Sequence, residues 1–157
     1  MHEPHVIRLR GPWTYEPLEH HAGKSPAAAN SPLPDGGTGQ APDWTETLGA
    51  HFRGRVRFTR FFNCPTNLGA DERVRLACDG ADARGTVALN GRKILELDGS
   101  VARSCDITDA LRPRNEIVAE IDLRPDAQEP HRPSDRAGLG GGILGDVRLE
   151  IGPRTDR

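Results

Sequence analysis

The chain has 157 residues, with 21 basic and 23 acidic side chains and a formal net charge of −2 at pH 7. This length suits one domain, expected over residues 1–157, that buries a sizeable hydrophobic core. The near-balanced charge gives no reason to expect nucleic acid as a partner. The N-terminus lacks the apolar run of a signal peptide, and no stretch reaches the roughly 18 apolar residues of a membrane span. We therefore expect a cytoplasmic protein that contacts no membrane.

The three cysteines are an odd number and have no metal-ligand spacing. Cys78 falls on the inward phase of a predicted strand, where it should pack as a small hydrophobic residue. Because the cytoplasm keeps thiols reduced, we expect Cys64, Cys78 and Cys105 to be free.

Most of the chain alternates apolar and polar residues with a period of two, which indicates half-buried β-strands. In residues 55–62, Val56 and Phe58 face one way, whereas Phe61 breaks the alternation, so we expect a bulge near Arg60. About eight or nine short strands are predicted in this way. The clearest of them, in chain order, are 5–9, 55–62, 73–78, 86–89, 93–97, 105–107, 116–123 and 146–151.

Turn residues separate these strands. The pair Asn90-Gly91 is a strong hairpin signal and joins residues 86–89 to residues 93–97. Two glycine-containing turns connect residues 73–78 to residues 86–89, so these two strands should flank a turn.

One short helical turn is expected at 108–111, with Thr108 or Asp109 as its N-cap. Two Pro- and Gly-rich segments, residues 16–42 and 125–142, are expected to be long loops. No segment has helical periodicity over three turns, so the pattern predicts an antiparallel β-sandwich of jelly-roll type. Its core should hold the inward residues of five strands: Val56, Phe58, Leu76, Leu89, Ile117, Ile121, Val147 and Leu149.

Six short segments occur in an order that resembles a known family: 58–62, 87–91, 106–109, 115–118, 142–143 and 147–149. The series is similar to the N-terminal sugar-binding domain of glycoside hydrolase family two, the β-galactosidase and β-glucuronidase group. The resemblance implies a galactose-binding-like jelly roll. The catalytic barrel of that family, with its paired glutamates, has no counterpart here, so the resemblance implies no glycosidase activity. Ala88 also stands where the family usually has a large aromatic residue.

Three residues are candidates for binding a sugar. Trp44 could stack on a sugar ring, or it could pack at the mouth of the sandwich. Asn90 and Asp98 lie beside turns and could hydrogen-bond hydroxyl groups, or they could simply form those turns.

Arginines provide a second candidate surface. Five of them hold the outward phase of two predicted strands: Arg53, Arg55, Arg57, Arg73 and Arg75. If the two strands are neighbours, these side chains form a face that attracts an acidic glycan or a phosphate, with Arg55 and Arg57 as its main ligands. The alternative is a solvated face on which the arginines pair with acidic residues of other strands, namely Glu120, Asp122 and Glu150.

The sequence predicts neither a cofactor nor a metal site. The loop histidines His20, His21 and His131 lack ligand spacing, and no Asp-rich loop offers the oxygen cluster that calcium needs. We therefore expect a non-catalytic carbohydrate-binding module whose partner is a mono- or oligosaccharide. The alternative is a structural or protein-interaction domain that associates with a second copy or with another protein.

Overall fold

Ten β-strands and one 3-10 turn make up the described structure. The computed structural model describes residues 5–20, 33–40, 42, 48, 52, 54–81, 84–99, 101–123, 142–143 and 146–153. The elements, in chain order, are β1 (His5–Arg8), β2 (Trp13–His20), β3 (Gly37–Gly39), β4 (Gly54–Asn63), β5 (Glu72–Cys78), β6 (Arg84–Leu89), β7 (Arg92–Asp98), β8 (Arg103–Asp106), η1 (Thr108–Ala110), β9 (Arg114–Leu123) and β10 (Val147–Pro153).

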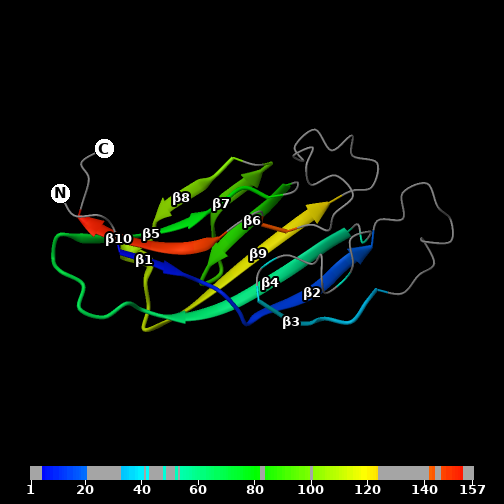
Figure 1. Cartoon of the computed structure of the whole chain (residues 1–157), viewed down its shortest axis with the longest axis horizontal. Helices are drawn as coiled ribbons and strands as arrows, with labels where there is room; N and C mark the ends of the chain where they lie inside the picture. The colour runs from blue at the N-terminus through cyan, green and yellow to red at the C-terminus, as the bar shows by residue number, and fades with distance from the viewer. Residues whose placement is uncertain are drawn as a thin grey trace.

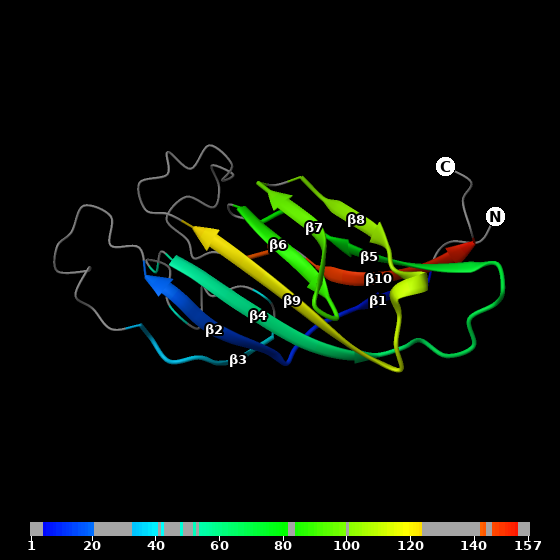
Figure 2. The same ribbon diagram turned by 180° about the vertical axis from the view of Figure 1, so that it is seen from behind.

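The strands form two antiparallel sheets that pack face to face (Figures 1 and 2). One sheet has four strands in the order β1-β10-β5-β8, and the other has six in the order β3-β2-β4-β9-β6-β7. This arrangement confirms the predicted antiparallel β-sandwich. Residues 124–141, which include most of the second expected loop, lie outside the described residues.

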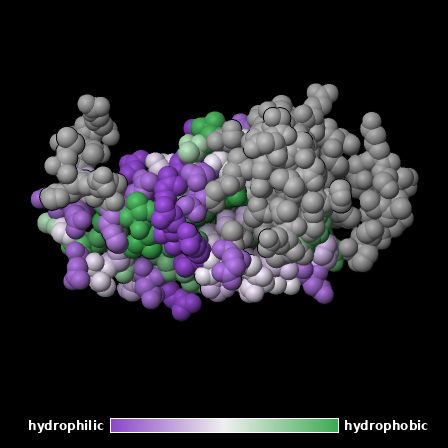
Figure 3. All heavy atoms as spheres, in the orientation of Figure 1, coloured by the Kyte–Doolittle hydropathy of each residue, from purple (hydrophilic) through white to green (hydrophobic). Residues whose placement is uncertain are grey.

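The core fills the space between the sheets. All eight residues predicted to be inward are buried, and Trp13 joins them with its indole Nε1 donating to the carbonyl oxygen of Leu9 at 2.8 Å. These residues are buried because side chains alternate between the two faces of a strand. Strand β9 shows this most clearly, since Ile117, Ala119 and Ile121 occupy every second position and are fully buried. In the face seen in Figure 3, the described surface is mostly hydrophilic and hydrophobic atoms appear only in small groups.

The expected bulge near Arg60 is wrong. Strands β4 and β9 pair without a register shift from Gly54 opposite Leu123 to Asn63 opposite Arg114. Arg60 simply continues the inward phase, and its guanidinium group reaches the backbone carbonyl oxygens of residues 10 and 61. A long charged side chain can therefore occupy an inward position of an apolar strand without breaking its alternation.

The Asn90-Gly91 hairpin is confirmed between β6 and β7, with φ angles of 52° and 87° at its two central residues. The turn expected before β6 is instead a connection between the sheets, because β5 pairs with β10 and β8 whereas β6 pairs with β9 and β7. The alternation in β5 and β6 predicts which residues of each strand are inward. It does not show that the two strands belong to different sheets and face the core from opposite sides.

Two further expectations need correction. Strand β2 extends to His20 and Gly37–Gly39 forms β3, so the first loop is shorter than residues 16–42. The helical turn exists as η1, but Ile107 is its N-cap and neither Thr108 nor Asp109 caps it. Ile107 has no side chain that could accept a hydrogen bond, and the backbone N–H of Thr108 donates instead to Oδ1 of Asp106, two residues earlier, at 2.9 Å.

Candidate functional site

Two cross-strand rows of mainly charged residues lie on the outer face of the six-stranded sheet. Because side chains alternate between faces, the residues opposite one another in neighbouring strands form rows across the sheet. The first row alternates in charge across five strands: Glu19, Arg55, Asp122, Arg84 and Asp98. The terminal amino group of Arg55 lies 3.3 Å from the carboxylate of Glu19.

The second row lies two residues along β4, β9, β6 and β7 and three along β2, where the register shifts between Pro17 and Glu19, and it is more acidic. It contains Glu16, Arg57, Glu120, Thr86 and Glu96. Arg57 pairs with Glu120 at 3.3 Å, and Glu96 pairs with Lys93 of its own strand at 2.7 Å. These exposed pairs orient the side chains but add little stability.

A groove of about 450 Å³ runs over these two rows. Nine residues of β4, β6, β7 and β9 line it: Arg55, Arg84, Gly85, Thr86, Glu96, Leu97, Asp98, Glu120 and Asp122. A volume of this size is in the range of small-molecule sites. The lining has two basic and four acidic residues, so its formal charge is +2 − 4 = −2.

One donor in the groove wall has no partner within the described part of the chain. The Nε atom of Arg55 is buried, and no described residue accepts its hydrogen. A buried N–H without an acceptor costs free energy, and because this atom has no exposed surface it is not itself a contact point for a ligand.

The structure brings some of the predicted site residues together. Arg55 and Asp98 line the same groove although 43 positions (98 − 55) separate them in sequence. Arg57 lies beside the groove through its ion pair with Glu120. Trp44 lies outside the described residues.

Asn90 lies at the opposite end of β6 from Arg84, where β6 meets the hairpin, and it does not line the groove. Its side-chain oxygen accepts from the N–H of Glu116 at 2.9 Å, and its amide nitrogen donates to Asn115 at 3.0 Å. The structure therefore uses Asn90 to join the hairpin to β9.

The face of five arginines is wrong because its two strands lie in different sheets. Arg55 and Arg57 are on β4 of the six-stranded sheet, whereas Arg73 and Arg75 are on β5 of the four-stranded sheet. Arg53 lies outside the described residues. The arginines on β5 have their own partners, since Arg73 binds Asp106 at 2.9 Å and Arg75 donates to Ser104 at 2.9 Å.

The sequence interpretation missed Arg84, Thr86 and Glu96 as groove residues. The sequence pattern that could have identified them is the alternation in β6 and β7 on either side of the Asn-Gly turn. It puts all three residues in the outward phase of one hairpin, with Thr86 opposite Glu96 and Arg84 opposite Asp98. A hydrogen bond from Lys93 lowers the pKa of Glu96, so this carboxylate stays ionised and accepts hydrogen bonds rather than donating a proton.

Within the described ranges, no group of three or more His, Cys, Asp or Glu residues could hold a metal ion. None of the described helical segments is long and apolar enough to cross a membrane.

Several solved glycosidase structures superpose on this sandwich. An FMN-binding β-glucuronidase from Faecalibacterium prausnitzii L2-6 matches with a TM-score of 0.70 and 21% identity, over 96% of this chain and 23% of its own. A Bifidobacterium dentium β-glucuronidase complexed with coumarin-3-O-glucuronide matches with a TM-score of 0.65 and 22% identity, over 96% of this chain and 30% of its own. The β-glucuronidase of an uncultured Clostridium species matches with a TM-score of 0.68 and 19% identity, over 97% of this chain and 30% of its own.

The chain shares its fold with part of these glycosidases. It spans less than a third of the length of each of the three. The galactose-binding-like jelly roll and the resemblance to glycoside hydrolase family two are thus confirmed at the level of the fold. No family model and no curated protein matches the sequence.

Proposed function

We propose that this chain is a non-catalytic carbohydrate-binding module whose ligand lies in the groove on the outer face of the six-stranded sheet. The observation that carries the proposal is the convergence of Arg55 and Asp98, from distant strands, on one groove of about 450 Å³. The shared fold with part of several glycosidases supports a sugar as the ligand class.

The polar groups of the groove suit sugar hydroxyls. A hydroxyl can donate to the carboxylates of Asp98 or Asp122 while its oxygen accepts from the guanidinium group of Arg55, whose side chain is 41% exposed. No aromatic residue is among the described residues of the lining, so none of these residues stacks on the sugar. We expect a Kd of roughly 1 mM or weaker, which corresponds to about −4 kcal/mol.

The same groove is a poor place for glycoside hydrolysis. A glycosidase needs one carboxylic acid with a raised pKa to protonate the leaving oxygen. The pKa of Glu96 is instead lowered by Lys93, and Glu120 is held by Arg57 at 3.3 Å. Purified protein should therefore release no nitrophenol from nitrophenyl glycosides, and measurable turnover would contradict a non-catalytic role.

A pair of arginine variants tests the location of the site. Arg55→Gln removes the groove donor, and Arg75→Gln makes the same change on an exposed residue of the other sheet. In NMR titrations with a panel of neutral, amino and acidic monosaccharides, Arg55→Gln should weaken binding about threefold to tenfold, the loss of one charged hydrogen bond at a partly exposed site. Arg75→Gln should bind like the unchanged protein. Equal loss in both variants would place the ligand elsewhere.

A protein-interaction role is the second candidate, and one surface feature favours it. Phe61 is 47% exposed on the outer face of β4, and the guanidinium carbon of Arg114 lies 4.7 Å from the centre of its ring. Aromatic and arginine side chains dominate the energetic centres of protein interfaces. If this residue joins two copies, sedimentation velocity should show a dimer that Phe61→Ala converts to monomer; a monomer at all concentrations would exclude self-association.

We also infer a cytoplasmic location. All three cysteines are free, as expected for a protein kept in a reducing compartment.

A further inference from the structure

We propose that the groove selects a sugar that carries a protonated amine and disfavours a uronic acid. This inference rests on the proposed carbohydrate-binding function and gives it a ligand class. It reverses the expectation from sequence, in which the outward arginines suggested an acidic glycan.

The charge balance of the groove is the first reason. Its described lining sums to −2, with two guanidinium groups against four carboxylates. Three charged residues outside the lining form ion pairs with it. Arg57 and Lys93 add two positive charges by pairing with Glu120 and Glu96, whereas Glu19 adds one negative charge by pairing with Arg55, so the total stays negative at −1.

The placement of the two arginines is the second reason. Arg84 lies between Asp122 on β9 and Asp98 on β7, so a carboxylate opposes it on each side. Arg55 lies between Asp122 and Glu19 in the same row, and its terminal nitrogen is 3.3 Å from Glu19. An incoming carboxylate would have to compete with these acids for either guanidinium group.

The β7 side of the groove offers the place for an amine. Glu96 and Asp98 are two residues apart on one strand and therefore about 7 Å apart on the same face. The Glu96 side chain is 72% exposed and Asp98 is also exposed, so a ligand can reach both without displacing core residues. An ammonium group bound here would meet two carboxylates, sharing Glu96 with Lys93, while the ring hydroxyls lie over Thr86 and Arg84 of the neighbouring strand.

Titration of the full chain with matched sugars tests this selection. Glucosamine, N-acetylglucosamine, glucose and glucuronate are compared by amide shifts at low salt and at about pH 6, where an aliphatic amine is protonated. Glucosamine should bind about fivefold tighter than glucose or N-acetylglucosamine, the upper end for an exposed ion pair. Glucuronate should bind more weakly than glucose, and both differences should shrink as salt is added.

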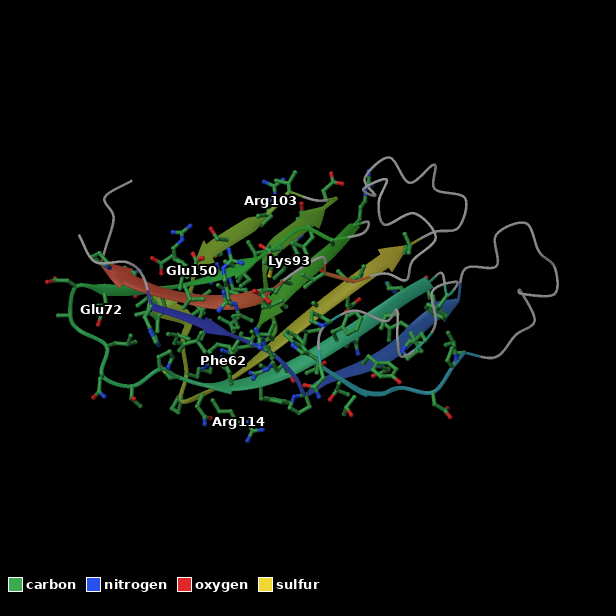
Figure 4. The ribbon with its side chains drawn as sticks, in the orientation of Figure 1. Phe62, Glu72, Lys93, Arg103, Arg114 and Glu150 are labelled. Atoms are coloured by element: carbon green, nitrogen blue, oxygen red, sulfur yellow. The ribbon has the colours of Figure 1, made fainter. Side chains whose placement is uncertain are left out.

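Two exposed aspartates provide the variant and its control. Asp98→Asn removes one groove carboxylate and should reduce the glucosamine preference to less than about twofold. Asp71→Asn makes the same change beside Glu72, which lies at the far end of the molecule (Figure 4), and should keep the full preference.

The outcomes separate the two proposals. Glucuronate binding as tightly as glucose, or a glucosamine preference that survives Asp98→Asn, would overturn the charge selection and leave sugar binding intact. The absence of binding by all four sugars would overturn the proposed function, and the selection with it.

Discussion

At the scale of single residues, Asn115 holds the turn before β9 together. It is fully buried and makes three hydrogen bonds within the structure: it accepts from the N–H of Arg112 at 2.9 Å and from Asn90 at 3.0 Å, and it donates to the carbonyl of Arg112 at 2.8 Å. Its polar atoms are thus satisfied without water, which is the condition under which a buried amide is tolerated.

Removing this amide should destabilise the fold. Asn115→Ala leaves the N–H of Arg112 without its acceptor and removes the shorter of the two hydrogen bonds from the Asn90 amide, so the free energy of unfolding should fall by about 1–3 kcal/mol. Asn63→Ala, at an exposed position on the outward phase of β4, should change it by less than about 0.5 kcal/mol. Urea unfolding measures both. Equal values for the two variants would mean that the network contributes nothing.

Asp106 makes the stability depend on acidity. Burial alone would raise its pKa, but hydrogen bonds from Arg73 and Thr108 outweigh that effect and hold the pKa at about 2, below the ordinary value of 3.8. A carboxyl with a lowered pKa in the folded state stabilises the fold fully above its unfolded pKa and loses that contribution as pH falls through the folded value. The loss should therefore fall between about pH 4 and pH 2.

A double-mutant cycle checks this assignment. Asp106→Asn should flatten the decline of the unfolding free energy between pH 4 and pH 2, the window set by the two pKa values. Arg73→Gln should flatten it as well, and the double variant should lose little more than either single variant. An unchanged acid profile for Asp106→Asn would show that other carboxyls cause the decline.

At the scale of the strands, alternation explains both the core and the outer surface. Leu89 and Ile121 hold the inward phase of β6 and β9, which are neighbours in the six-stranded sheet. The outward phase of the same two strands places Arg84 and Asp122 opposite each other on the outer face. One periodicity thus positions the core and the groove together.

Truncation of these inward residues should be costly. Leu89→Ala and Ile121→Ala each create a cavity and should lower the free energy of unfolding by about 2–5 kcal/mol. Val101→Ala, at a side chain that is 53% exposed, is the matched control and should cost well under 1 kcal/mol. Costs below about half a kcal/mol for both buried positions would mean that the strand phase is misassigned.

The sequence predicts elements better than it predicts their partners. A period of two identified the strands around Phe58 and Ile121 and the inward residues of each, because burial on one face leaves a local pattern. It could not show that β5 and β6 enter different sheets, since that depends on pairing with β10 and β9 from distant parts of the chain. The groove could not be predicted for the same reason, because Arg55 and Asp98 are brought together only by the register of four paired strands.

At the scale of the whole molecule, the sandwich protects one thiol. Burial raises the pKa of Cys78 to about 12, so almost no reactive thiolate forms at that site. In the folded protein Cys78 should resist iodoacetamide at pH 8, whereas thiol titration under denaturing, non-reducing conditions should find all three cysteines. Mass mapping after alkylation measures the protection. Finding one thiol per denatured chain would reveal a disulfide and contradict a cytoplasmic location.

The sandwich also separates two charged outer surfaces. Arg103 lies at the β8 margin of the four-stranded sheet, and Arg114 lies where β9 begins in the six-stranded sheet (Figure 4). Only the six-stranded sheet carries the groove described above. A sugar that binds by the proposed route must therefore perturb one face and leave the other unchanged.

Mapping amide shifts during a sugar titration tests the central claim most directly. With a monosaccharide raised to about ten times the expected millimolar Kd, shifts should concentrate at Gly85, Thr86, Leu97 and Asp98 in the groove and spare β5 and β10 of the other sheet. Saturating shifts confined to these groove amides are the predicted result. A spectrum that does not change with any neutral, amino or acidic sugar, or shifts gathered on the four-stranded sheet, would contradict the account.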